Sequence, residues 1–303
     1  MLQGLKLKRD IVIIAALILT SSLAGAYLGR DRRYTIKVLC CESLIEPYEL
    51  ITGYFLKLYP SYKVVILKID ICDLYEKIRS EKPDLIVFDD RFVMEQLLSD
   101  NLVWNYTIFA SDSLVICYKN SSWFSREIEE KGVEVLREAR VAAMTGECNI
   151  LGLRTRAFLK LALNSSLEYL GEVVECNSVM EVFYRLDKDE ADCAITYRSL
   201  ALRYGFMVYE LPNNASLGFL NMSYDYVFEH GGFSWEATPI CYCVAVLNCS
   251  ERPDLGYKII NVTFSDIGIN ILTNKKLTVL KRPLTVGRVC FTLGRRIRMQ
   301  FHL

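Results

Sequence analysis

Polar side chains bracket a short apolar run within residues 188–201, KDEADCAITYRSLA. We expect a buried strand at about 192–196, with Glu190 before it and with Tyr197 and Ser199 just after it. Ligands of open α/β sheets bind at strand ends and helix N-termini, where backbone N–H groups point outward. A carboxylate and two hydroxyls placed there can bind a small polar ligand. The alternative is purely structural, with Glu190 as a solvated charge at a helix end and Tyr197 as a half-buried aromatic.

Residue patterns typical of enzymes are missing from the sequence. Asp89 and Asp90 follow an apolar run and are expected to cap the next helix, because no His, Lys or Cys base accompanies them. The two histidines, His230 and His302, are too few and too far apart for a His-rich metal site. The closely spaced cysteines lack C-x-x-C spacing, and no phosphate-binding loop or nucleophile motif occurs in the right context. We therefore expect neither catalytic residues nor a cofactor.

The strands and helices that must position the polar residues alternate along the chain. Apolar runs predict strands at 34–40, 63–69 and 84–88, each followed by a helix. This alternation predicts doubly wound, mostly parallel sheets. The apolar runs at 104–119 and 240–247 are expected to carry the chain into a second domain and back. A chain of 303 residues is long enough for two domains.

The two crossings divide the chain into predicted units. Residues 34–112 and 246–284 are expected to form lobe one, and residues 113–245 are expected to form lobe two. Residues 285–303 are predicted to be a basic tail, since eight Lys and Arg residues and no acidic residue follow Asn274. Such blocks are usually solvated tails, and the alternative is attachment to an anionic lipid surface or an acidic partner.

Residues 1–33 are expected to be an export signal or a membrane anchor. Basic residues precede an uncharged stretch of 18 residues at 11–28. A membrane span needs about 20 apolar residues, so this stretch lies at the lower limit for an anchor. Ala24-Gly25-Ala26 also fits the A-x-A cleavage pattern of a signal peptide. Under either alternative, the rest of the chain is expected on the extracellular side of the membrane, anchored or secreted.

Two further patterns agree with export. Eleven cysteines are compatible with disulfides outside the cell, and their odd number leaves at least one thiol without a partner in the chain. The pairing is left open, although Cys117 and Cys193 are expected to be small core residues because they lie in apolar strands. Seven N-x-S/T sequons suggest a glycoprotein. The sequons begin at Asn105, Asn120, Asn164, Asn214, Asn221, Asn248 and Asn261.

The charge balance argues against nucleic acid as a partner. Lys and Arg total 36 and Asp and Glu total 36, so the formal net charge is zero. The basic residues are also not interleaved with aromatic residues in the manner of an RNA-binding motif. We therefore expect no nucleic-acid partner.

Five segments, in order along the chain, resemble the archaeal tungstate/molybdate-binding proteins that serve as receptors of ABC importers. The likeness covers about residues 34–284. It implies an α/β, two-lobed fold of the type II periplasmic-binding-protein class, with two crossover strands joining the lobes. It also implies a monomer that binds a tetrahedral oxoanion in the inter-lobe cleft by hinge closure and docks on a membrane permease. The segments are VLCCESLIEPYELITGYFLKLYP, KPDLIVFDDRFVMEQLL, NYTIFASDSLVICYKNSS, GECNILGLRTRAFLKLA and KDEADCAITYRSLALRYGFMVYELP.

The resemblance also implies particular ligand-binding residues. The family holds its oxoanion with serine hydroxyls and backbone N–H groups from one lobe, and with carboxylates from the other that complete the coordination of the metal centre. Ser43 matches the first family serine, Glu190 matches one carboxylate, and Tyr197 matches the tyrosine that follows the strand. Asn149 stands where the second carboxylate is found, with Glu147 nearby as a substitute ligand.

Three positions depart from the family pattern and leave alternatives open. Glu42 precedes Ser43 where the family has glycine, and the second family serine aligns near Ile71 and Cys72. The chain is therefore expected to bind tungstate or molybdate, or else another small solute. A third alternative is a surface glycoprotein or sensor that kept the fold and lost transport. Donors converging on a cleft favour binding, whereas a cleft filled by Glu42, Ile71 and Cys72 favours that third alternative.

Overall fold

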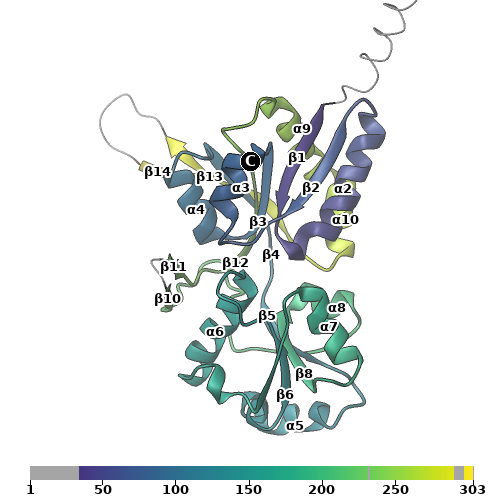
Figure 1. Cartoon of the computed structure of the whole chain (residues 1–303), viewed down its shortest axis with the longest axis vertical. Helices are drawn as coiled ribbons and strands as arrows, with labels where there is room; N and C mark the ends of the chain where they lie inside the picture. The colour runs from purple at the N-terminus through teal and green to yellow at the C-terminus, as the bar shows by residue number, and fades with distance from the viewer. Residues whose placement is uncertain (1–33, 231–232, 290–296, 303) are drawn as a thin grey trace, which may run out of the picture.

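The computed structural model describes residues 34–230, 233–289 and 297–302. They form two lobes stacked along the long axis of the molecule (Figure 1). Each lobe is a mixed sheet with helices packed against it, which confirms the predicted two-lobed α/β fold. Within these residues, every helix is too short or too polar to span a membrane. The signal or anchor predicted at 1–33 lies outside the described residues.

Lobe one is built on a seven-stranded sheet. Its strands, in sheet order, are β14 (Ile297–His302), β13 (Thr278–Val289), β4 (Asn105–Ser111), β12 (Ile240–Val246), β3 (Leu85–Asp90), β1 (Thr35–Cys40) and β2 (Lys63–Lys68). Its helices are η1 (Glu42–Leu44), α2 (Ile45–Leu58), α3 (Leu74–Glu81), α4 (Arg91–Ser99), α9 (Pro253–Thr263) and α10 (Asp266–Asn274). β1 pairs in parallel with both β2 and β3, because a helix connects each strand to the next and parallel neighbours need such a crossover.

Lobe two is built on a five-stranded sheet. Its strands, in sheet order, are β7 (Glu172–Glu175), β6 (Arg140–Ala143), β8 (Cys193–Tyr197), β5 (Leu114–Tyr118) and β9 (Met207–Glu210). Its helices are α5 (Phe124–Lys131), η2 (Gly132–Arg137), α6 (Ile150–Leu163), η3 (Leu167–Tyr169), α7 (Val179–Asp187) and α8 (Arg198–Arg203). β7, β6 and β8 run parallel, and β5 runs antiparallel to its neighbours β8 and β9.

The central strands of both sheets are apolar and inaccessible to solvent. Every residue of β3, β5, β8 and β12 is buried. Strands covered on both faces appear in a sequence as continuous apolar runs, which is why they could be located without a structure. Cys117 in β5 and Cys193 in β8 are buried free thiols, and this confirms their predicted place in the core.

The chain crosses into lobe two between β4 and β5 and returns to lobe one before β12. β4 of lobe one leads directly into β5 of lobe two (Figure 1). The sequence placed the return boundary between residues 245 and 246, but β12 pairs along its length with β3 and β4 of lobe one. The structure therefore moves the boundary to the N-terminal side of Ile240. The physical reason is that β12 is buried on both sides within the sheet, so no part of it can belong to the other lobe.

The segment between β9 and β12 spans residues 211–239. Part of it forms a two-stranded antiparallel hairpin, β10 (Val227–His230) and β11 (Phe233–Glu236). Trp235 of β11 is fully buried, and its Nε1 donates a hydrogen bond of 3.2 Å to Asp90 Oδ2 in lobe one. This segment therefore contacts the inter-lobe region.

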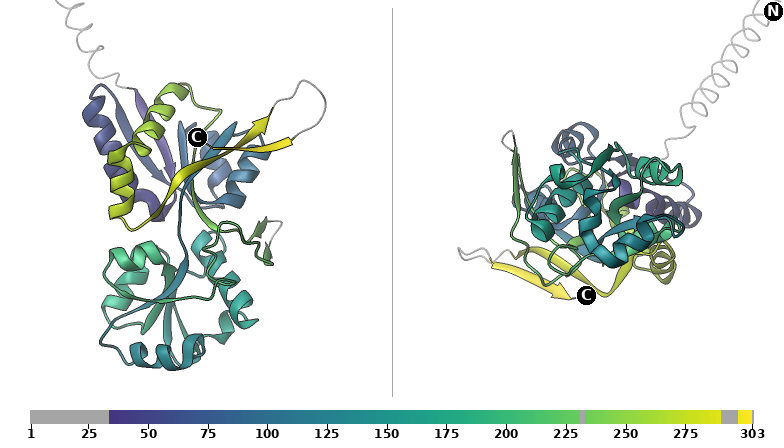
Figure 2. Two further views of the ribbon diagram at one scale, coloured as in Figure 1. Left: turned by 180° about the vertical axis from the view of Figure 1, so that it is seen from behind. Right: turned by 90° about the horizontal axis from the view of Figure 1, so that it is seen from below.

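The predicted basic tail at 285–303 begins inside a strand. β13 extends to Val289 and pairs with β14, and it runs obliquely across lobe one in the view from behind (Figure 2). Val286 is buried, and Thr285 Oγ1 lies 3.0 Å from Thr107 Oγ1 of β4. The start of the supposed tail is thus part of the sheet, because residues 284–287 pair with β4.

Candidate functional site

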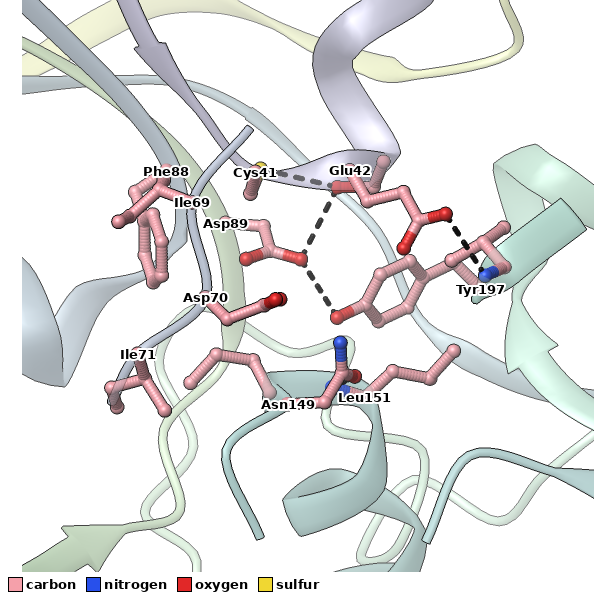
Figure 3. Close-up of a pocket in the computed structure, with 13 residues that line it drawn as sticks. Cys41, Glu42, Ile69, Asp70, Ile71, Phe88, Asp89, Asn149, Leu151 and Tyr197 are labelled. Carbon is pink, nitrogen blue, oxygen red and sulfur yellow. Dashed lines mark hydrogen bonds between the residues drawn. The ribbon is translucent and has the colours of Figure 1, made fainter. Parts of the chain in front are cut away.

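A small cavity lies between the lobes, where strand ends and a helix N-terminus meet. Lobe one contributes Glu42, Asp70 and Asp89, and lobe two contributes Asn149 and Tyr197 (Figure 3). The volume is about 20 Å³, which is room for a single water molecule. Figure 3 shows the side chains of Asp70, Asp89 and Tyr197 pointing toward one another at its centre.

The carboxylate of Asp89 accepts hydrogen bonds from both lobes. Its Oδ2 accepts a bond of 3.2 Å from Ser43 Oγ and one of 2.7 Å from Tyr197 OH. Burial raises the pKa of the Tyr197 hydroxyl well above its ordinary value, so this group stays protonated and acts as a donor. Two residues expected to bind an oxoanion, Ser43 and Tyr197, therefore donate to a carboxylate of the chain itself.

A fully buried arginine lies beneath this carboxylate. Arg154 of α6 contacts Asp90 Oδ2 at 3.0 Å through Nη2 and Asp89 Oδ2 at 3.5 Å through Nη1, and it also donates to the Tyr197 hydroxyl. Burial alone would lower the pKa of Arg154, but Tyr197, Asp89 and Asp90 raise it, so the guanidinium stays charged. One buried cation from lobe two therefore faces two carboxylates of lobe one.

Asp90 combines a structural role with this ion pair. Its Oδ1 accepts from Val93 N at 3.0 Å and caps α4, which confirms the cap predicted for the Asp89-Asp90 pair. Burial raises the pKa of the Asp90 carboxyl, although Arg154 acts in the opposite direction. The cap fixes the end of β3 and so fixes where Asp89 points.

Three of the five predicted site residues line the cavity. Ser43 and Tyr197 do so with their hydroxyls bonded to Asp89, as described above. Asn149 is the N-cap of α6, and its Oδ1 accepts from Leu151 N at 2.9 Å and Gly152 N at 3.3 Å. The N-terminus of α6 therefore faces the cavity, as expected of an anion site.

The other two predicted residues lie elsewhere. Glu190 forms an ion pair with Arg185 at the surface, and its side chain is 44% exposed. Glu147 Oε2 lies 3.5 Å from His230 Nε2, and neither residue lines the cavity. Among the described residues, no group of three or more His, Cys, Asp or Glu side chains is arranged to hold a metal ion.

The sequence did not identify Asp89, Arg154 or Asp70 as site residues. Asp89 ends a strand that is a parallel neighbour of β1, and β1 leads to Ser43, so both residues belong to one edge of the sheet. Arg154 interrupts an apolar helix face that also carries Leu151 and Phe158. A lone charge on such a face indicates a buried ion pair, which was the available signal.

A disulfide crosses the mouth of the cleft. Cys72 of lobe one is bonded to Cys148 of lobe two, with their Cα atoms 5.1 Å apart. Beside it, Ile71 N donates a hydrogen bond of 3.2 Å to the Cys148 carbonyl. On the other side of the cleft, Val179 N donates to Glu42 Oε1 at 3.2 Å. The two lobes are therefore closed on each other.

Comparison with known proteins agrees with this architecture. The model of a family described as bacterial extracellular solute-binding protein matches residues 36–274. One similar structure, from Clostridium difficile, is assigned by its title to the substrate-binding domain of a molybdenum ABC transporter. It superposes with a TM-score of 0.58 at 18% identity, and the match covers 82% of this chain and 100% of that one.

Two further solved structures are similar. The periplasmic molybdate-binding protein of Azotobacter vinelandii has a TM-score of 0.59 at 15% identity, covering 81% of this chain and 100% of that one. Iron-bound HitA from Pseudomonas aeruginosa has a TM-score of 0.55 at 14% identity, covering 79% and 84%. At these identities the likeness shows a shared fold.

Proposed function

Because the chain belongs to the family of bacterial extracellular solute-binding proteins, we propose that it is an extracytoplasmic receptor that binds a small solute between its lobes and delivers it to an ABC permease. The observation that carries this proposal is the convergence of Ser43 Oγ from lobe one and Tyr197 OH from lobe two on one buried cavity. A site built from both lobes couples ligand binding to closure.

The proposed ligand is a tetrahedral oxoanion such as molybdate or tungstate. With the lobes parted, the hydroxyls of Ser43 and Tyr197 and the positive end of the α6 dipole at Asn149 would face an oxoanion. Two structures of the same fold are described by their titles as proteins of molybdenum or molybdate transport. The proposal makes Ser43, Asn149 and Tyr197 the ligand-binding residues.

The proposed mechanism is hinge closure. The cavity of about 20 Å³ has room for about one water molecule, so an oxoanion can enter only when the lobes part. The direct β4–β5 connection and the segment between β9 and β12 are the chain crossings about which the lobes would rotate. A ligand that contacts both lobes favours the closed form by its differential affinity for that form.

The disulfide and the sequence patterns of the chain support a location outside the cytoplasm. Disulfides persist in oxidising compartments, and Cys72–Cys148 joins residues 76 positions apart. The seven sequons point the same way, as does the apolar stretch at 11–28. Attachment to the membrane through residues 1–33, with the permease as partner, completes the proposal.

A second candidate function is favoured by the cavity and the disulfide together. A volume of about 20 Å³ is filled by one water molecule, and a covalent bond holds the mouth of the cleft. Both features suit a surface glycoprotein or sensor that kept the fold and no longer transports a solute.

A thermal-shift titration of the purified protein with tungstate, molybdate, sulfate and phosphate tests the proposal. A ligand that binds only the folded state stabilises it by about 2.7 kcal/mol at a hundredfold excess over Kd. The receptor function predicts a saturable rise in Tm with tungstate or molybdate. A cooperative melt that none of the four anions moves, before or after reduction of the disulfide, would favour the second candidate.

A further inference from the structure

We propose that Asp89 decides whether the inter-lobe site accepts an anion, because its carboxylate already occupies the donors that an oxoanion would need. The inference rests on the proposed function and deepens it, since it names the residue that sets the affinity for the ligand. It is carried by hydrogen bonding, by burial and by the balance of charges around the cavity.

The hydrogen bonds place Asp89 in the position of a ligand. A single oxygen, Oδ2, accepts from Ser43 of lobe one and from Tyr197 of lobe two. A tetrahedral oxoanion bridging the lobes would use the same two hydroxyls. Each hydroxyl has one proton to donate, so Asp89 and a bound oxoanion compete for both.

The charges oppose a second anion. Arg154 is fully buried and faces Asp89 and Asp90, so one positive charge is already matched by two negative ones. Asp70 and Glu42 add carboxylates to the wall of the same cavity, and of these two Glu42 is paired with Lys68 at 2.9 Å. A dianion placed there meets like charges in a water-poor site, where their repulsion is strong.

The second oxygen of Asp89 also disfavours binding of an oxoanion. Oδ1 is buried, and no hydrogen bond from another described residue reaches it. An acceptor left without a donor at the wall of a small cavity repels a further acceptor, and oxoanions present only acceptors. A water molecule, which has two donors, suits this position better than molybdate does.

Removing the carboxylate would reverse each of these conditions. In Asp89→Ala, the hydroxyl protons of Ser43 and Tyr197 are released from Asp89, while Tyr197 OH still accepts from Arg154. Arg154 retains Asp90 as its single counter-ion, and the cavity gains the volume of a carboxyl group. In Asp89→Asn, the shape is kept, the charge is lost and one acceptor oxygen becomes an NH2 donor. Comparing the two variants separates the effect of charge from the effect of volume.

The test is isothermal titration calorimetry of the full chain with molybdate, tungstate, sulfate and phosphate. Wild type is compared with Asp89→Ala, Asp89→Asn and the matched control Glu190→Ala, which removes a carboxylate at the surface. Each protein is titrated with Cys72–Cys148 intact and after reduction, so that hindered entry is not mistaken for weak affinity. Circular dichroism establishes whether each variant is folded. If Asp89→Ala is unfolded, the comparison is made with Asp89→Asn alone.

We expect a folded Asp89 variant to bind at least one oxoanion about tenfold more tightly than wild type, with Glu190→Ala equal to wild type. Asp89 variants that bind no tighter than wild type, or more weakly, overturn the inference. If an Asp89 variant binds an oxoanion and wild type binds none, the inference is supported. In that case the native ligand is not an oxoanion. A wild type that binds and loses affinity on substitution of Asp89 keeps the proposed function and overturns the inference.

Discussion

The hydroxyl of Tyr197 in lobe two donates a 2.7 Å hydrogen bond to the carboxylate of Asp89 in lobe one, 108 positions earlier in the chain. Ser43 and Arg154 contact the same carboxylate oxygen. One atom therefore gathers contacts from both lobes at the centre of their interface. Substitutions around it measure how firmly the closed arrangement is held.

Tyr197→Phe is expected to lower the free energy of unfolding by about 1–3 kcal/mol, because it removes a buried donor and leaves Asp89 and Arg154 without one of their partners. Urea denaturation measures the change. Tyr204→Phe is the matched control, since Tyr204 is 38% exposed, and we expect it to change stability by less than about 0.5 kcal/mol. Equal losses in the two variants would show that the inter-lobe contact contributes nothing.

Arg154→Met is expected to cost about 3–5 kcal/mol of stability, because it leaves two buried carboxylates without a counter-ion. Adding Asp90→Asn to this variant removes one of the uncompensated charges and should restore part of the loss. Arg198→Met provides the comparison, since Arg198 pairs with Glu210 at the surface and such pairs are worth about 0–1 kcal/mol. A double variant less stable than Arg154→Met would contradict the ion-pair explanation.

The double variant Cys72→Ser, Cys148→Ser is expected to lose about 4 kcal/mol of stability in the chain-entropy description of a loop closed across 76 positions. It should also let the lobes part, which small-angle X-ray scattering detects as a larger radius of gyration. Cys249→Ser, which replaces a half-buried free thiol, is the control. An unchanged radius of gyration after loss of the disulfide would mean that the noncovalent contacts alone hold the lobes closed.

Asp192 is expected to stabilise the protein in a pH-dependent manner. Partial burial acts to raise the pKa of Asp192, but hydrogen bonds from Arg140 hold this pKa below its ordinary value. The carboxylate is thus favoured in the folded state, and its contribution is present above the unfolded pKa of about 3.9 and is lost as the pH falls through the lower folded value.

Asp192→Asn should therefore be less stable than wild type by about 1–3 kcal/mol at pH 7, and this gap should narrow as the pH falls below about 4. Urea denaturation across this range measures the gap. Asp187→Asn, at a side chain that is 68% exposed, should show little gap at any pH. A constant gap for Asp192→Asn would indicate lost packing instead of a lost charge.

The fold could be predicted because its signals are local. Alternating apolar runs and helices located β1, β2 and β3, and the order of the segments fixed the two-lobed class. The family resemblance brought Ser43, Asn149 and Tyr197 together, and each lies at a strand end or helix start on the side of its lobe that lines the cavity. The return of β12 was misplaced because an apolar strand does not reveal which sheet will bury it.

The rest of the site depends on which side chains meet across the lobes. The sequence shows that Asp89 follows a strand, but not that Ser43 and Tyr197 would both donate to it. Glu190 matched a family carboxylate by position, yet Arg185 lies five residues earlier on the same helix end and pairs with it. Cysteine pairing is equally nonlocal, so Cys72–Cys148 was not foreseeable among eleven cysteines.

β12 lies between β3 and β4, although it is synthesised after all of lobe two. Lobe one therefore cannot join β3 to β4 until residue 246 has emerged, whereas the strands of lobe two are contiguous and finished by Glu210. We expect lobe two to fold first, and pulse-labelled hydrogen exchange should find its amides protected before those of β3 and β4. Until β12 arrives, the facing edges of those two strands are open to pairing with other chains, so the nascent protein needs protection from aggregation during export.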